Sequence, residues 1–324
     1  MLICEAELGI GLVGLGRLTE FVAMTLWADA QARALTAGTG GTLRDIVDTA
    51  GARLYPGYFW THVTVPPERL LERHQVWDRV AVGVDVKTFG PILESTYVLG
   101  TPSELAEGAP TTSLPAMRSA AMFFIDGTPG EPQPATPKKG TVNALPKLEK
   151  PPSALARFKD VRASGVIDAA QAHRLRLSAP VACPIVTGRE IAAGQHALVF
   201  AQFVKLFDAA ERALLSELEP PTPAELVDHL AVLDRQIFYL DNCGLSSVVM
   251  VHARGTIEHC DPKLTGTSDQ VAAAVLKLEM TAYEATTLKL LSVAAATKLF
   301  VVPWNRPGLL HAAERLSRRY GVTA

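Results

Sequence analysis

Two helical patterns, each followed by a series of strand-like segments, constrain the fold of this 324-residue chain more than any other feature. In residues 18–35 the apolar positions recur at helical spacing, with Thr19 placed to cap the helix and Gly38 placed to end it. Residues 196–218 repeat the pattern, with an apolar stripe that includes Phe203. A helix with one apolar face must bury that face against another layer.

Strand-like runs follow both helical patterns. After the first they cover residues 54–65, 79–90, 92–99 and 120–125, and after the second 235–240, 246–257, 271–280 and 287–302. One long helix followed by several antiparallel strands, twice, predicts an α+β chain with an internal structural repeat. Residue identity between the two halves is too low to establish a duplication.

A proline-rich segment separates the halves. Residues 128–152 (TPGEPQPATPKKGTVNALPKLEKPP) are poor in apolar residues, which is typical of an extended connector on the surface. We therefore expect a first domain over residues 1–128, a linker and irregular connection over 129–180, and a second domain over 181–324. The second domain is expected to end in a surface helix over 306–320, where arginines near the end suit the helix dipole.

Composition argues against several classes of function. A formal net charge of -2 without basic clusters argues against a nucleic-acid partner. No apolar run is long enough for a membrane span and no basic segment precedes the apolar start, so we expect a cytoplasmic protein. The four scattered cysteines form no CxxC pair, and His252 and His259 would lie more than ~20 Å apart on one strand, so no metal site is expected. Motifs for nucleotide binding or a serine nucleophile elbow are absent.

The segment RLYPGYFWTHVTVPP, residues 53–67, concentrates four aromatic rings in a chain with only 6% aromatic residues. Rings gathered in this way either fill a core or line a pocket. Proline and glycine inside a strand, here Pro56 and Gly57, mark an edge, a bulge or a close approach of the backbone by a ligand. A close approach by a ligand would make this segment part of a functional site.

Residues 193–211 (AGQHALVFAQFVKLFDAAE) resemble the start of the central helix of hot-dog acyl-thioester enzymes, in which a Gly-His step precedes the helix. In that fold a curved antiparallel sheet wraps around one long helix, so the resemblance implies a double hot dog. Within that group, residues 51–60 and 235–244 make the chain similar to the polyketide-biosynthesis family typified by the bifunctional acyltransferase/decarboxylase of the leinamycin pathway.

The resemblance implies an acyltransferase that takes an acyl group, typically methylmalonyl, from coenzyme A, decarboxylates it and passes the product to an acyl carrier protein. Acyl-coenzyme A and an acyl carrier protein are then the expected partners. Coenzyme A and the phosphopantetheine arm enter as substrates, and no metal or redox cofactor is implied. The oligomeric state stays open, with a homodimer as one arrangement.

A tyrosine serves as the nucleophile in that family, which implies Tyr55 or, as its nearest rival, Tyr58. A phenol with a pKa near ~10 needs a positive neighbour or hydrogen-bond donors to become a nucleophile. Arg53 lies on the same strand face as Tyr55 under period-two alternation, so Tyr55 is preferred. The structural alternative is a half-buried strand tyrosine whose hydroxyl is hydrogen-bonded.

Three further residues are candidates for the site. The amide of Asn242 can donate to a thioester carbonyl or an enolate oxygen, although Asp-Asn-Cys-Gly also reads as an Asx turn. His196 lies at the expected start of the second helix, where backbone N–H groups can bind a substrate carbonyl and the ring can act as a base. Glu20 holds the matching place in the first half, next to the expected cap Thr19.

Two other functions remain open. A thioesterase would hydrolyse the acyl thioester with water positioned by His196 or Glu190, although the chain has Ala192 and Ala193 where such enzymes usually carry an acidic residue before the Gly-His step. A non-catalytic protein would bind an acyl thioester within a biosynthetic assembly, and its tyrosines would only pack.

Overall fold

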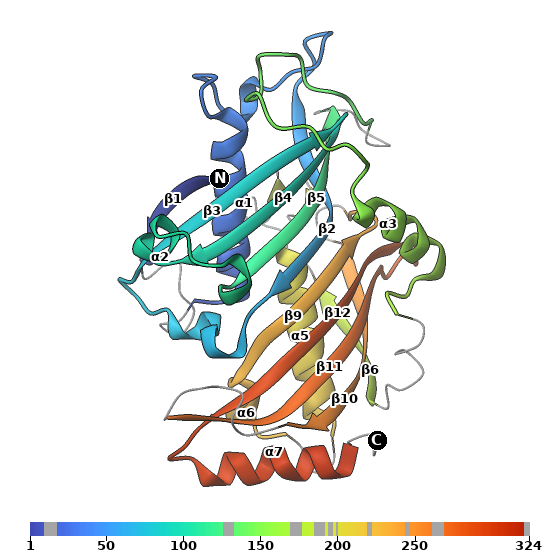
Figure 1. Ribbon diagram of the computed structural model, residues 1–324. Helices are drawn as coiled ribbons and strands as arrows, with labels where there is room; N and C mark the ends of the chain where they lie inside the picture. Colours follow the sequence, from blue (N-terminus) through green and yellow to red (C-terminus); the bar gives the residue numbers. More distant parts are fainter. Residues whose placement is uncertain are drawn as a thin grey trace. The chain divides into compact units, whose positions relative to one another are not determined.

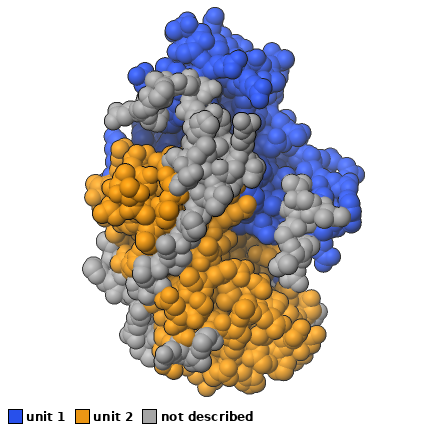
Figure 2. Space-filling model, turned by 180° about the vertical axis from the view of Figure 1, so that it is seen from behind, with its two compact units in different colours: residues 1–63, 73–160 blue, residues 64–72, 161–324 orange. Residues whose placement is uncertain are grey.

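The structure, a computed structural model, describes most of the chain. The described residues are 1–9, 18–125, 133–168, 177–184, 192–193, 197–198, 200–218, 222–243, 247–260 and 269–320. They form two compact units (Figure 2). Unit 1 comprises residues 1–63 and 73–160, and unit 2 comprises residues 64–72 and 161–324.

Unit 1 consists of one long helix and an antiparallel sheet whose strand order is β1-β3-β4-β5-β2 (Figure 1). Its elements are β1 (Leu2–Glu7), α1 (Glu20–Thr36), β2 (Leu54–Thr64), β3 (Arg79–Phe89), β4 (Ile92–Gly100), α2 (Pro102–Ala106) and β5 (Ala116–Ile125). The side-chain oxygen of Thr19 accepts a hydrogen bond from the backbone N–H of Val22 and caps α1, as predicted. Trp27 and Leu35 are fully buried on this helix, which contacts β3 and β1.

Unit 2 repeats this arrangement with an antiparallel sheet in the order β9-β12-β11-β10-β6 (Figure 1). Its elements are β6 (Leu177–Pro184), α5 (Gln202–Ser216), α6 (Ala224–Val227), β9 (Leu230–Tyr239), β10 (Val248–His259), β11 (Gln270–Glu284), β12 (Leu290–Pro303) and α7 (Pro307–Tyr320). The helix α5 contacts β6 and β10 and buries Phe203 and Phe207. The C-terminal helix α7 packs on β10 and β11 and buries Leu309 and Leu316.

The helix of unit 2 begins later than its periodicity predicts. It starts at Gln202 rather than at residue 196, and residues 197–198 form the short strand β8, which pairs with β7 (Ala192–Ala193). The short apolar run at residues 197–201 fits a strand as well as a helix, which is why the spacing alone misplaces the boundary.

Most of the described part of the segment between the two halves belongs to unit 1. The backbone N–H of Lys138 donates to Val47, that of Asn143 to Leu35 and that of Leu148 to Thr88. The helix α3 (Ser153–Ser164) follows it, and β6 begins at Leu177, inside the stretch expected to be irregular. Short 3-10 turns also occur at Leu43–Asp45, Pro67–Arg69, Leu71–Arg73 and Thr111–Ser113.

No helix in the described ranges is long and apolar enough to cross a membrane.

Candidate functional site

The two candidate tyrosines both lie on β2 in unit 1 and both are half-buried. The ring of Tyr55 is in contact with the ring of Phe124 on β5, at 5.9 Å between centroids. Gly57 makes room for the same phenylalanine, because a Cβ atom at this position would lie 2.8 Å from the Phe124 ring. The approach of this aromatic side chain therefore explains the glycine of the Pro-Gly step.

Tyr58 is held by hydrogen bonds rather than by ring packing. Its hydroxyl donates to the side-chain oxygen of Gln31 on α1, with 2.6 Å between the oxygens. The amide nitrogen of Gln31 in turn donates to Oγ of Ser95 on β4 at 2.8 Å. Gln31 and Ser95 are buried, so these bonds connect a half-buried phenol with the interior of unit 1.

A second tyrosine completes this group. Tyr97 on β4 is fully buried, and its hydroxyl lies 3.2 Å from Oγ of Ser119 on β5. Burial raises the pKa of Tyr97, although hydrogen bonds with Ser119, Ser95 and Tyr58 act in the opposite direction. Tyr97 therefore remains a neutral donor near neutral pH. We call Gln31, Tyr58, Ser95, Tyr97 and Ser119 the tyrosine network.

Arg53, which the sequence places beside Tyr55, precedes β2 and is exposed. Its charge contributes to the lowered pKa of Asp45, which hydrogen bonds from the backbone and side chain of Thr42 lower more strongly. A role for Arg53 toward Tyr55 stays a prediction.

The other predicted residues lie in different surroundings. Glu20 is buried at the first position of α1. Asn242 follows β9 in unit 2 and is exposed, and its side-chain oxygen accepts a 2.8 Å hydrogen bond from the backbone N–H of Cys243. His196 and Glu190 lie outside the described residues. Within those residues no group of three His, Cys, Asp or Glu side chains is arranged to hold a metal ion.

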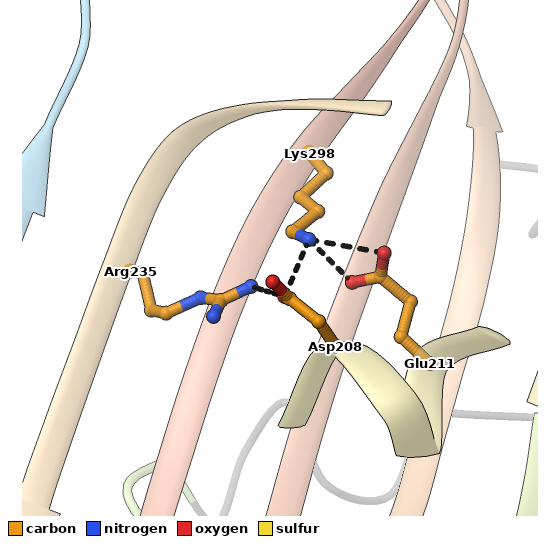
Figure 3. Close-up of polar contacts among 4 residues, drawn as sticks. All are labelled: Asp208, Glu211, Arg235 and Lys298. Atoms are coloured by element: carbon orange, nitrogen blue, oxygen red, sulfur yellow. Dashed lines mark hydrogen bonds and ion pairs between the residues drawn. The ribbon is translucent and has the colours of Figure 1, made fainter. Parts of the chain in front are cut away.

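Unit 2 contains a cluster of four charged side chains that the sequence analysis missed (Figure 3). Asp208 and Glu211 point from α5 toward Arg235 on β9 and Lys298 on β12. Oδ1 of Asp208 lies 2.7 Å from the guanidinium of Arg235 and 3.0 Å from the ammonium of Lys298, which is also 2.8 Å from Glu211. Two acidic and two basic side chains are thus paired within this charge cluster.

The two carboxyl groups of the charge cluster differ in exposure. The side chain of Asp208 is 41% exposed, whereas that of Glu211 is 3% exposed. Burial would raise the pKa of Asp208, but Lys298 and Arg235 outweigh it and hold that pKa well below its ordinary value. Burial, assisted by the negative charge of Asp208, raises the pKa of Glu211 against the opposing effect of Lys298.

The sequence contains a faint signal for this cluster. Lys298 is the single charge in the apolar run of β12 from Leu291 to Val302, and Glu211 falls within the buried stripe of α5. A charge on a buried face needs a partner of opposite sign. The partner cannot be read from spacing, because Lys298 and Glu211 are 87 positions apart.

Comparison with known proteins bears on the fold. No protein-family model matches the sequence, and no curated protein matches it either. A solved structure assigned as an oleoyl thioesterase from Lactobacillus plantarum has a TM-score of 0.55 at 12% identity, covering 92% of this chain and 95% of that one. An acyl-ACP thioesterase from Bacteroides thetaiotaomicron has a TM-score of 0.50 at 9% identity, covering 92% and 97%.

This chain is a double hot dog. Each hot-dog unit supplies one long helix and one antiparallel sheet, as the resemblance implied, and the α+β class is confirmed. At these low identities the likeness concerns the fold. Each unit also carries polar residues from its central helix into the helix–sheet interior, an amide in unit 1 and two carboxylates in unit 2.

Proposed function

We propose that this protein is an acyl-thioester enzyme that transfers an acyl group such as methylmalonyl from coenzyme A to an acyl carrier protein, through a tyrosine of β2. The observation that carries the proposal is the hydroxyl of Tyr58, a half-buried phenol held 2.6 Å from an amide of the central helix. The double hot-dog fold supports it, since two solved structures with similar folds are named as thioesterases.

The transfer divides into two exchanges. The phenol oxygen attacks the thioester carbonyl, the carbon–sulfur bond breaks, and the thiolate of coenzyme A leaves with the phenolic proton. The phosphopantetheine thiol then attacks the resulting aryl ester and returns the proton to the tyrosine. Phenols and thiols have pKa values near ~10 and ~8.5, so an aryl ester and a thioester are similarly activated and both exchanges are feasible.

Decarboxylation belongs to the same proposal. Loss of carbon dioxide from a methylmalonyl group leaves an enolate, which needs a hydrogen-bond donor at its oxygen. The sequence offers the amide nitrogen of Asn242 as a candidate donor, and its side-chain oxygen accepts a hydrogen bond from the backbone N–H of Cys243. Replacement of Asn242 by Asp would remove the donor with little change in size.

The test is mass spectrometry of the intact protein after incubation with methylmalonyl-coenzyme A, with and without a carrier protein. We expect an acyl adduct on the wild type, its loss in Tyr58→Phe or Tyr55→Phe, and a loaded carrier protein whose mass reports whether carbon dioxide has left. An unmodified wild type that loads no carrier protein would overturn transfer. Tight binding of acyl-coenzyme A without turnover, equal in both variants, would identify a binding protein instead.

Thioester hydrolysis is a second candidate, favoured by the charge cluster. Asp208 is ionised at neutral pH and partly exposed, so it can orient a water molecule toward a thioester. Its lowered pKa also makes it a weak base, and for this reason transfer is placed first. Release of free thiol without a carrier protein, lost in Asp208→Asn but retained in Tyr58→Phe, would reverse that order.

A further inference from the structure

We propose that Gln31 and Ser95 are a positioning pair that serves Tyr58 both as a phenol and as a phenolate or ester oxygen, and that Tyr58 rather than Tyr55 carries the acyl group. This inference rests on the proposed transfer function and identifies the residues that position its nucleophile. Three observations carry it, namely the burial of the pair, its hydrogen-bonding capacity, and the different surroundings of the two tyrosines.

The burial of Gln31 indicates that its amide has a specific role. Its side chain is 2% exposed on α1, where the other buried neighbours along the helix, such as Met24, Trp27 and Ala34, are almost all apolar. A buried amide without partners costs several kcal/mol, roughly 2 to 7 depending on the reference state. A leucine or methionine would fill the same space without that cost, so the amide is retained for its hydrogen bonds.

The hydrogen bonds lead outward to a single half-buried group. Ser95 is buried at 1% exposure and accepts a hydrogen bond from the amide N–H of Gln31, while the amide oxygen accepts one from the hydroxyl of Tyr58. Tyr97, also buried, interacts with Ser95 and Tyr58 through its hydroxyl. The tyrosine network therefore fixes the direction of the Tyr58 proton, which points to the amide oxygen of Gln31.

An amide paired with a hydroxyl can satisfy Tyr58 in either state without gaining or losing a proton. When Tyr58 is a phenol, the amide oxygen of Gln31 accepts a hydrogen bond from its hydroxyl, and the amide N–H donates to Ser95. Once the phenol proton has left with the coenzyme A thiolate, a half-turn of the amide presents N–H to the Tyr58 oxygen. The hydroxyl of Ser95, which is both donor and acceptor, then donates to the amide oxygen.

Tyr55 lies in a different environment on the same strand. Its ring contacts Phe124, and Gly57 is needed beside it to admit that phenylalanine. Ring packing with Phe124 positions the body of Tyr55, whereas the contact with Gln31 is made at the hydroxyl oxygen of Tyr58. A nucleophilic phenol needs a donor at its oxygen, and the amide of Gln31 becomes that donor for Tyr58 after the half-turn.

The first measurement needs no substrate. The phenol of Tyr58 is titrated by ultraviolet absorbance of the full-length protein. For the wild type and for each Gln31 variant, the absorbance of the same protein carrying Tyr58→Phe is subtracted, so that the difference reports Tyr58. We expect Gln31→Leu to raise the titration midpoint of Tyr58 by about one pH unit, because a donor to the phenolate is lost. Gln31→Glu, which is nearly the same size, should raise it further, since an ionised carboxylate opposes the phenolate.

The second measurement follows acylation by methylmalonyl-coenzyme A. We expect the rate of adduct formation to fall by roughly 10²-fold in Gln31→Leu with little change in KM, as for loss of a donor used in the transition state. Ser95→Thr keeps the hydroxyl and should retain most of the rate, whereas Ser95→Ala should lose part of it. Thermal unfolding of each variant separates these effects from loss of the fold.

The outcomes are distinct. A midpoint for Tyr58 that is unchanged in folded Gln31→Leu and Gln31→Glu would overturn the positioning pair, as would peptide mapping that places the acyl group on Tyr55. If the Tyr58 midpoint shifts in the Gln31 variants but the wild type accepts no acyl group, the pair is supported and only the proposed transfer is overturned. A shifted midpoint together with an adduct on Tyr58 supports both.

Discussion

The ammonium of Lys298 lies 2.8 Å from one carboxylate oxygen of Glu211 and 3.0 Å from the other, in the interior of unit 2. Both side chains are buried, at 7% and 3% exposure. Removing a charge from water is costly, so such a pair is maintained only while each ion keeps its partner. The charge cluster is therefore sensitive to single substitutions, whatever its role in chemistry.

Lys298→Met is expected to lower the free energy of unfolding by about 3–5 kcal/mol, because buried Glu211 must then either stay ionised without its cation or take up a proton. Urea denaturation at pH 7 measures this. Adding Glu211→Gln to the same chain should restore part of the loss. As a control, Arg79→Ala removes the exposed pair with Glu5, whose side chains are 71% and 52% exposed, and should change stability by ~0–1 kcal/mol. Similar losses in the two variants would contradict the prediction.

Asp208 and Glu211 should influence stability with opposite dependence on pH. The pKa of Asp208 is lowered from 3.8, so its stabilising contribution is present above pH 3.8 and is lost as the pH falls toward the folded-state pKa. The pKa of Glu211 is raised from 4.5, so its contribution is present below pH 4.5 and is lost as the pH rises through the folded-state pKa.

Urea unfolding between pH 3 and pH 7 tests these signs. The stability difference between wild type and Asp208→Asn should shrink as the pH falls below about 4, whereas wild type should lose stability relative to Glu211→Gln as the pH rises above about 4.5. Parallel pH profiles for the two variants would show that the carboxylates do not differ in this way.

Local patterns in the sequence predict most of the elements. The predicted helix at 18–35 is α1 (Glu20–Thr36), and the predicted strands at 54–65 and 79–90 are β2 (Leu54–Thr64) and β3 (Arg79–Phe89). Apolar periodicity records which face of an element is buried, and that information is local. The double hot dog follows once each helix is combined with its own strands.

The candidate sites could not be obtained in the same way, because they depend on contacts between distant positions. Gln31 and Ser95 are 64 positions apart, and Lys298 and Asp208 are 90 apart. Spacing along one strand brought Tyr55 and Arg53 to one face but carried no information about α1. The roles of Tyr55, Tyr58 and Asn242 in catalysis remain predictions.

Gly57→Ala is expected to destabilise the protein by about 1–3 kcal/mol, since the new methyl group would meet the Phe124 ring at 2.8 Å. The penalty should be smaller in a chain that also carries Phe124→Leu, which a double-mutant cycle of unfolding free energies measures. Gly308→Ala serves as a control, because its Cβ would meet nothing within 4 Å. Unchanged stability of Gly57→Ala with weakened acyl-coenzyme A binding would instead mean that the glycine admits a ligand.

Cys243 should be a poor nucleophile in the folded protein. Burial, together with the charge of Glu284, raises the pKa of its thiol from 9.0 to about 11, so its thiolate fraction at pH 8 falls by roughly 100-fold. Alkylation by iodoacetamide, followed by peptide mass spectrometry, should therefore modify Cys243 about 100-fold more slowly in the native state than in urea. Equal rates would contradict this. The same reasoning predicts that Cys243→Ser keeps the full acyl adduct, because an acyl group held as an ester on Tyr58 does not pass through this thiol.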